Sequence, residues 1–162
     1  MESDKTVEYR SRRGLVDATE PRVKRRLWRK PGFDGVTSLR DMDEAIGEFL
    51  ATARSREGLT REQVAELLGI TGQVYGRYER AQLQLNVTRL VHLSEVLGFE
   101  PMEMIHAAAP HLFGDTLEQA KKKIALMRLM SRLKPEVVDS LLLLVGELSS
   151  EGDTPAGGSA RG

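Results

Sequence analysis

The stretch GITGQVYGRYERAQ, Gly69 to Gln82, differs from the apolar helical patterns on either side of it. It carries glycine, tyrosine, glutamine and arginine where a core helix would carry leucine and valine. Thr71 is a preferred residue type at the start of a helix, so the pattern predicts a short helix from Gly72 to about Arg80. Tyr75, with Ile70, can face the domain, which leaves the polar side chains on the opposite face.

The segment just before this stretch predicts another short helix. Thr60 and Gln63 have the spacing of a capping box, and Gly69 ends the pattern after about two turns. Its predicted buried face consists of Val64, Leu67 and Leu68. A short helix, a tight glycine turn and a second short helix make the helix-turn-helix arrangement, in which the second helix can enter a major groove of DNA.

Three further helices complete a predicted domain over residues 38–110. Ser38 and Asp41 suggest a capping box for the first, whose apolar stripe follows the spacing of one helix face. Asn86 is the expected N-cap of the fourth helix and Gly98 its stop. Pro101 opens a fifth, short helix. The stripe of the first helix consists of Met42, Ala45, Ile46, Phe49, Leu50 and Ala53.

Three motifs give this region a family resemblance. They are GLT-x-x-x-x-A-x-x-LGI from Gly58, T-x-x-x-x-x-R-Y-E-R from Thr71, and L-x-x-L-x-x-x-LGF-x-P-x-x-M from Leu90. Over roughly residues 39–106 the chain resembles the Cro and lambda-repressor-like family of bacterial helix-turn-helix regulators, also called XRE. The resemblance implies an all-α, five-helix DNA-binding domain that dimerises on operator DNA.

The resemblance also implies roles for single residues. Arg61 matches a position that contacts phosphate, and Arg54 and Glu79 match an ion pair inside the domain. The base-reading face of the family's recognition helix corresponds to Gly72, Gln73 and Arg77. Gly72 departs from the glutamine that is common at its position and has no side chain to read with.

Chemistry supports DNA contact by the predicted recognition helix. Gln73 and Arg77 lie four residues apart on one face. A glutamine can bond adenine N6 and N7, and an arginine can bond guanine O6 and N7. Thr71 and Arg80, at the two ends of the helix, are candidate phosphate contacts.

The first 37 residues are expected to form a basic, mostly irregular arm. Residues 1–40 hold 11 Lys and Arg against 6 Asp and Glu, although the whole chain has a formal net charge of zero. Arg25 and Arg26 lie in its most basic stretch and could bind phosphates or enter a minor groove. In the alternative interpretation, Leu27, Trp28 and Phe33 dock the arm onto the domain or onto a neighbour.

The sequence pattern of residues 111–149 predicts a pair of helices, one from about Asp115 to Lys134 and one from Pro135 to about Ser149. Its apolar surface exceeds what a lone hairpin can bury, which favours a homo-oligomer, either dimer or tetramer. Folding back onto residues 90–110 is the alternative. Residues 150–162 are Gly-, Ser- and Pro-rich and are expected to be disordered. The predicted oligomerisation residues are Ile124, Met127, Leu129, Met130, Leu133, Leu141 and Leu144.

The remaining features argue against other classes. Without cysteine there is no disulfide or thiolate metal site, and no apolar run approaches the roughly 20 residues of a membrane span. The three histidines have no metal-site spacing, and no catalytic motif is present, so we expect neither an enzyme nor a bound cofactor or metal. No small-molecule pocket is evident. We expect a cytoplasmic protein.

The sequence therefore predicts a DNA-binding transcriptional regulator of double-stranded operator DNA, with repression as the favoured mode. Two rival hypotheses are kept. In one, the protein is an antitoxin that binds DNA and neutralises a partner toxin through its C-terminal helices. In the other, it is a protein-interaction adaptor without DNA readout. Its only support is the missing side chain at Gly72 and the loss of a loop charge at Ala81 and Gln82, where the resembling family usually has Gly and Lys.

Overall fold

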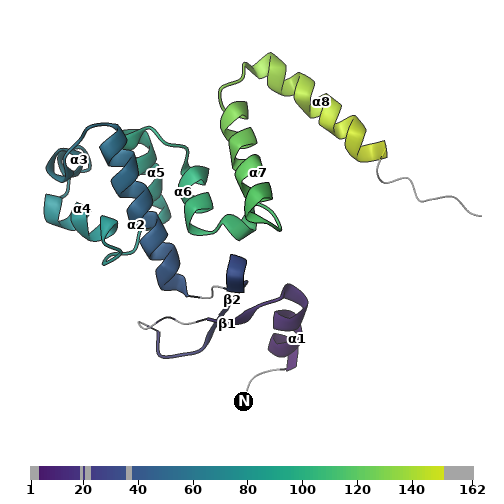
Figure 1. Cartoon of the computed structure of the whole chain (residues 1–162), viewed down its shortest axis with the longest axis horizontal. Helices are drawn as coiled ribbons and strands as arrows, with labels where there is room; N and C mark the ends of the chain where they lie inside the picture. The colour runs from purple at the N-terminus through teal and green to yellow at the C-terminus, as the bar shows by residue number, and fades with distance from the viewer. Residues whose placement is uncertain (1–3, 19, 21–22, 36–37, 152–162) are drawn as a thin grey trace, which may run out of the picture. The chain divides into compact units, whose positions relative to one another are not determined.

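A computed structural model describes residues 4–18, 20, 23–35 and 38–151 of the chain (Figure 1). The described residues are mostly helical, as the sequence predicts, and include one short two-stranded sheet. The chain divides into two compact units, residues 1–124 and 125–162. None of the helices in the described part is long and apolar enough to cross a membrane.

Five consecutive helices of the first unit enclose its main core. They are α2 (Leu39–Arg56), α3 (Arg61–Leu67), α4 (Gly72–Glu79), α5 (Val87–Leu97) and α6 (Pro101–Ala108). The rings of Phe49 and Phe99 meet edge to face with centroids 5.0 Å apart. The buried core side chains are Leu50, Ala53, Val64, Ala65, Leu68, Tyr75, Leu93, Leu97, Phe99 and Met104.

The predicted helix ends of this domain are mostly confirmed. The Thr60 hydroxyl accepts from the Gln63 amide at 3.2 Å and the Thr60 amide donates to the Gln63 side chain at 2.8 Å, which completes the capping box. Asn86 caps α5, whose C-terminal Gly98 has the left-handed φ of 65° that glycine favours. Pro101 opens α6. Local sequence signals therefore set most of these boundaries.

Two local predictions are wrong. Ser38 caps α2, but its hydroxyl accepts from the Arg40 amide at 3.1 Å rather than from the amide of Asp41. Leu67, predicted in the buried face of α3, is 57% exposed. Ala65 is buried instead, since α3 is only seven residues long and its face is set by packing rather than by periodicity.

The N-terminal arm is not mostly irregular where the structure describes it. It contains α1 (Asp4–Arg13) and the antiparallel strands β1 (Val16–Ala18) and β2 (Leu27–Arg29). The guanidinium carbon of Arg10 lies 3.6 Å from the centre of the Trp28 ring, so a cation–π contact joins helix to sheet. Three-residue strands are too short for an alternating pattern to reveal them.

The arm is also attached to the helical domain. Arg29 Nη1 donates to the Ser38 carbonyl at 2.6 Å. Phe33, in the short 3-10 helix η1 (Phe33–Gly35), meets His111 of η2 (Pro110–Leu112) edge to face, with ring centroids 6.5 Å apart. Burial, followed by the charges of Arg29 and Lys30, lowers the pKa of His111. The predicted docking of the arm onto its own domain thus has a structural basis at Phe33.

The C-terminal helices are α7 (Leu117–Met130) and α8 (Pro135–Glu151). The first ends four residues before the predicted Lys134, in a turn where the Ser131 hydroxyl donates to the Arg128 carbonyl. Ile124, predicted on the oligomerisation surface, is instead buried. Met127 and Leu141 are half-buried, whereas Leu129, Met130, Leu133 and Leu144 are exposed. Residues 150 and 151 of the predicted disordered tail belong to α8, and residues 152–162 lie outside the described residues.

Gly47 sets the distance between α2 and α4, a role that the sequence analysis did not assign. It is buried, and a Cβ atom built on it would collide with the carbonyl oxygen of Glu79 and lie 3.1 Å from that of Tyr78. Both obstacles are backbone atoms and cannot turn aside. The close approach of α2 to the end of α4 therefore requires glycine.

We expect Gly47→Ala to destabilise the first unit by about 1–3 kcal/mol, the usual cost of overpacking. Urea unfolding followed by circular dichroism measures the change. Gly146→Ala in α8 is the matched control, because a Cβ there meets nothing within 4 Å, and helix propensity alone favours alanine by up to about 1 kcal/mol. Equal stability of Gly47→Ala and wild type would contradict the close approach.

Candidate nucleic-acid interface

The orientation of α4 is fixed by its inner face. Tyr75 is fully buried, and Gly69 turns the chain between α3 and α4 with a φ of 65°. The Ile70 amide donates to the Ala65 carbonyl at 2.9 Å across this turn. Burial, followed by the nearby Glu79 carboxylate, raises the pKa of the Tyr75 phenol, so the group stays protonated. Helices α3 and α4 thus form a rigid helix-turn-helix pair (Figure 1).

Gln73 and Arg77 lie on the outer face of α4. Both residues are exposed, whereas Tyr75 and Gly76 between them are buried. Two of the predicted base-reading side chains therefore project one turn apart from the same exposed face. This face can offer an amide and a guanidinium to a ligand that lies along the helix.

Glu79 ends α4 and joins three helices. Its carboxylate oxygens accept from Arg54 Nε of α2 and from Arg61 Nε of α3, each at 2.6 Å. Arg54 Nη1 also donates to the Leu59 carbonyl at 2.8 Å. The Glu79 side chain is only 1% exposed. The expected Arg54–Glu79 pair is present, and Arg61 is a second partner that the sequence analysis did not anticipate.

The ionisation of Glu79 depends on both arginines. Burial by itself raises the pKa of its carboxyl, but the hydrogen bonds from Arg54 and Arg61 outweigh burial and hold the pKa below its ordinary value. The same contact with Glu79 raises the pKa of Arg54. Glu79 therefore stays charged at neutral pH while shielded from solvent.

Arg61 combines an internal contact with an exposed one. Its Nε bonds Glu79, yet the side chain remains 44% exposed at the start of α3. Its other guanidinium N–H groups can still donate to an anion at the N-terminus of the helix, where phosphate binding is favourable. Fixing Nε restricts the side chain before any ligand arrives.

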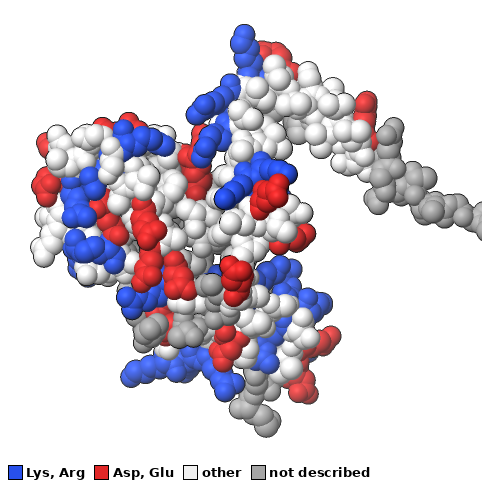
Figure 2. All heavy atoms as spheres, in the orientation of Figure 1, with Lys and Arg blue, Asp and Glu red and all other residues white. Residues whose placement is uncertain are grey.

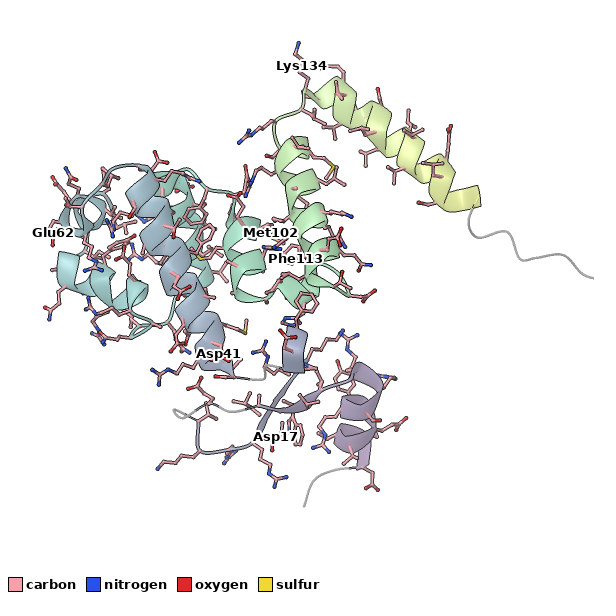
Figure 3. All side chains as sticks on the ribbon, in the orientation of Figure 1. Asp17, Asp41, Glu62, Met102, Phe113 and Lys134 are labelled. Atoms are coloured by element: carbon pink, nitrogen blue, oxygen red, sulfur yellow. The ribbon has the colours of Figure 1, made fainter. Side chains whose placement is uncertain are left out.

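Gly72 does not face open space. A Cβ atom on it would lie 3.0 Å from Oε1 of Glu62, which Figure 3 labels where α3 meets α4. A Cβ on Gly76 would likewise lie 2.9 Å from Nη1 of Arg80. Both neighbours are the ends of flexible, exposed side chains. Gly72, predicted on the base-reading face, thus lies beside Glu62 of α3.

The other predicted phosphate contacts lie in two places. Thr71 is exposed at the start of α4, where its hydroxyl accepts from the Val74 amide at 3.3 Å. Arg80 is exposed at the end of the helix, and its Nε donates to Gln82 at 3.3 Å. Arg25 and Arg26 are exposed in the connection between β1 and β2. Thr71 and Arg80 thus lie at the two ends of α4, whereas Arg25 and Arg26 belong to the arm.

Acidic side chains occupy the exposed face of α2. Asp41, Glu44 and Glu48 are exposed at helical spacing, and Figure 2 shows acidic atoms along α2. Over α3 and α4 the charges are mixed, because exposed Glu62 and Glu66 accompany the arginines there. A polyanion would be repelled by the α2 surface. The charge pattern therefore argues against α2 as the anion-binding side.

The structure also contains an apolar pocket that the sequence did not reveal. Its volume is about 200 Å³, and it lies within the first unit between α2, α5 and α6. The walls come from residues far apart in sequence, among them Met42, Leu85, Leu90, Met104 and Leu112. Such a hollow leaves no local sequence pattern.

The sequence of this chain is similar to those of known helix-turn-helix proteins. Residues 45–107 match a family model described as a helix-turn-helix domain. An uncharacterized HTH-type transcriptional regulator of Rickettsia prowazekii is 36% identical over 78 residues, which is 44% of this chain and 60% of that protein. A Rickettsia conorii protein of the same description matches equally, over 62% of its length.

Two further proteins are similar over shorter parts of the chain. The SPbeta prophage-derived uncharacterized HTH-type transcriptional regulator YonR of Bacillus subtilis is 38% identical over 53 residues, 33% of this chain and 49% of that protein. The crystal structure of the restriction-modification controller protein C.AhdI of Aeromonas hydrophila also matches this chain, with 29% sequence identity. That match has a TM-score of 0.38 and covers 41% of this chain and 94% of C.AhdI.

Fold, site and relatives together define a helix-turn-helix protein. The predicted resemblance is confirmed for the helix-turn-helix domain, because the matching family model describes such a domain and the relatives are described as HTH-type transcriptional regulators. The chain spans about 60% of the length of its two Rickettsia relatives.

We expect Glu79→Gln to cost on the order of 3 kcal/mol at pH 7, because the substitution removes the charge from a buried ionic cluster. The depressed pKa of Glu79 stabilises the fold above the unfolded carboxyl pKa of about 4.3, and this stabilisation is lost as pH falls through the folded-state value. Urea unfolding from pH 7 to pH 3 should therefore show the variant and the wild type converging in acid.

Glu44→Gln is the control for this measurement, since Glu44 forms an exposed ion pair with Arg40. Its pH dependence should match that of wild type. A Glu79→Gln variant that kept the full wild-type acid sensitivity would show that Glu79 is not the group responsible.

Proposed function

We propose that the protein is a sequence-specific, DNA-binding transcriptional regulator that reads operator DNA with α4. The observation that carries the proposal is the pairing of an exposed Gln73 and Arg77 on a helix whose other face is anchored by buried Tyr75 and Glu79. A recognition helix needs both an exposed polar face and a rigid seat. The names of the relatives, all HTH-type transcriptional regulators, support the same function.

In the proposed complex, α4 lies in the major groove. Arg77 donates two hydrogen bonds to guanine O6 and N7, and Gln73 pairs with adenine N6 and N7. Gly72 contributes no side-chain contact, because glycine has no side chain. Direct readout by this helix therefore depends mainly on two side chains per copy.

Phosphate contacts hold the helix in register. Arg61 and Thr71 stand at the starts of α3 and α4, where backbone amides also favour anions, and Arg80 stands at the end of α4. Arg25 and Arg26 add a second phosphate contact from the arm. These side chains fix orientation but read no sequence.

Operator binding by a homo-oligomer completes the proposal. Two copies related by a two-fold axis would present two α4 helices to successive major grooves, about one helical turn apart. Repression follows where such an operator overlaps the polymerase site. Selection of duplexes from a random pool tests the proposal, because it should enrich a palindrome with that spacing. Equal binding to every duplex would contradict sequence-specific readout.

We expect Gln73→Ala and Arg77→Ala each to weaken binding to the selected duplex by about 1–3 kcal/mol, or roughly 5- to 150-fold. Binding to scrambled DNA should change much less. Fluorescence anisotropy measures both affinities. Arg40→Ala removes another exposed arginine, from the acidic α2 surface, and is the control. Parallel losses on both duplexes would assign Arg77 to phosphate rather than to a base.

The proposed phosphate contacts of the arm lead to a different prediction. The double variant Arg25→Ala with Arg26→Ala should weaken binding to all duplexes alike and lower the slope of log affinity against log salt by about 2, because each lost phosphate contact removes about 0.9. A salt titration on selected and scrambled DNA measures this slope. An unchanged slope would show that the arm makes no phosphate contact.

A further inference from the structure

The two C-terminal helices carry opposite charges. From Pro135 to Glu151, α8 contains four acidic side chains and no lysine or arginine. In α7 the single acidic residue is Glu118, against four basic side chains. The acidic set is Glu136, Asp139, Glu147 and Glu151, and the basic set is Lys121, Lys122, Lys123 and Arg128.

The apolar residues of α8 form a wide exposed face. Val137, Leu141, Leu144 and Leu148 follow the 4-3-4 spacing of a coiled-coil seam. Leu142 and Val145 lie beside this seam and widen the apolar arc. Leu142, Leu144, Val145 and Leu148 are each more than half exposed. The seam is therefore accessible to a partner helix.

The two C-terminal helices expose many large apolar side chains. Ten large apolar side chains between Leu126 and Leu148 are each 37–72% exposed. A stable interface buries on the order of 800 Å² on each partner, and an exposed set of this size can contribute to one. An exposed apolar patch of this size marks an interaction surface rather than an ordinary solvated face.

Charge decides which helices meet. Pairing α8 with the α8 of another copy would bring eight carboxylates together, and pairing α7 with α7 would do the same for the basic side chains. Pairing α8 with α7 brings opposite net charges together, and such complementarity favours this partner over the like-charged pairings. We propose that two copies associate through their C-terminal helices, with the acidic α8 of each copy packed against the basic α7 of the other.

This inference rests on the proposed oligomeric state and names its partner and pairing. Its test uses no DNA, so its outcome is independent of whether the protein reads an operator. Two full-length charge-reversed chains are needed. The first carries Lys121→Glu, Lys122→Glu and Lys123→Glu in α7, and the second carries Glu136→Lys, Asp139→Lys and Glu147→Lys in α8.

Sedimentation equilibrium at low salt, with one chain fluorescently labelled, measures association. Wild type should be dimeric at micromolar concentration. Each reversed chain alone should dissociate with a Kd at least ten-fold higher, because α7 and α8 then carry the same sign. An equimolar mixture should form a one-to-one heterodimer with a Kd within a few-fold of wild type. Circular dichroism checks that helix content is unchanged.

Three outcomes would overturn the pairing. A monomeric wild type would remove the interface. Unchanged association of the α7-reversed chain would leave α8 against α8 as the contact. Failure of the mixture to associate would mean that α7 and α8 pair only within one chain. Glu44→Lys with Glu48→Lys on α2 is the matched control, and it should leave the Kd unchanged.

Discussion

The carboxylate of Glu79 is the contact on which the position of α4 depends. It lies at the end of α4, accepts from Arg54 of α2 and from Arg61 of α3, and is almost completely shielded from water. A buried charge is tolerable only when it is fully paired, so the three helices must keep one arrangement for the cluster to persist. The backbone contact at Gly47 holds α2 against the same end of α4. Together they fix α4 at its C-terminal end, while Tyr75 fixes its middle.

This arrangement explains why a short, glycine-containing helix can serve as a rigid element. An isolated eight-residue helix is unstable in water, and its stability comes from packing. In α4, Gly72 and Gly76 weaken the helix by itself but let Glu62 and Arg80 lie against it. The outer face of α4 then contributes little to the stability of the fold. Gln73 and Arg77 are therefore available for the proposed readout.

Some of this could be predicted from sequence because it is local. The capping box at Thr60 and the glycine stop at Gly98 depend on residues three or four apart, and both are confirmed. Other features depend on residues distant in the chain. The second partner of Glu79, the neighbour of Gly72 and the Arg10–Trp28 contact arise only when separate elements meet. Gly47 did leave a signal, since a glycine inside a strongly periodic helix costs about 1 kcal/mol and calls for a reason.

The folded arm has a consequence for kinetics. A disordered basic tail would search many conformations and lose that freedom whenever it settled on a ligand. Here the stacking of Arg10 on Trp28 and the contact of Phe33 with His111 already restrict the hairpin that carries Arg25 and Arg26. An anion bound by this hairpin would meet side chains whose backbone is already folded. Less conformational entropy would therefore be lost between the first encounter and the final complex.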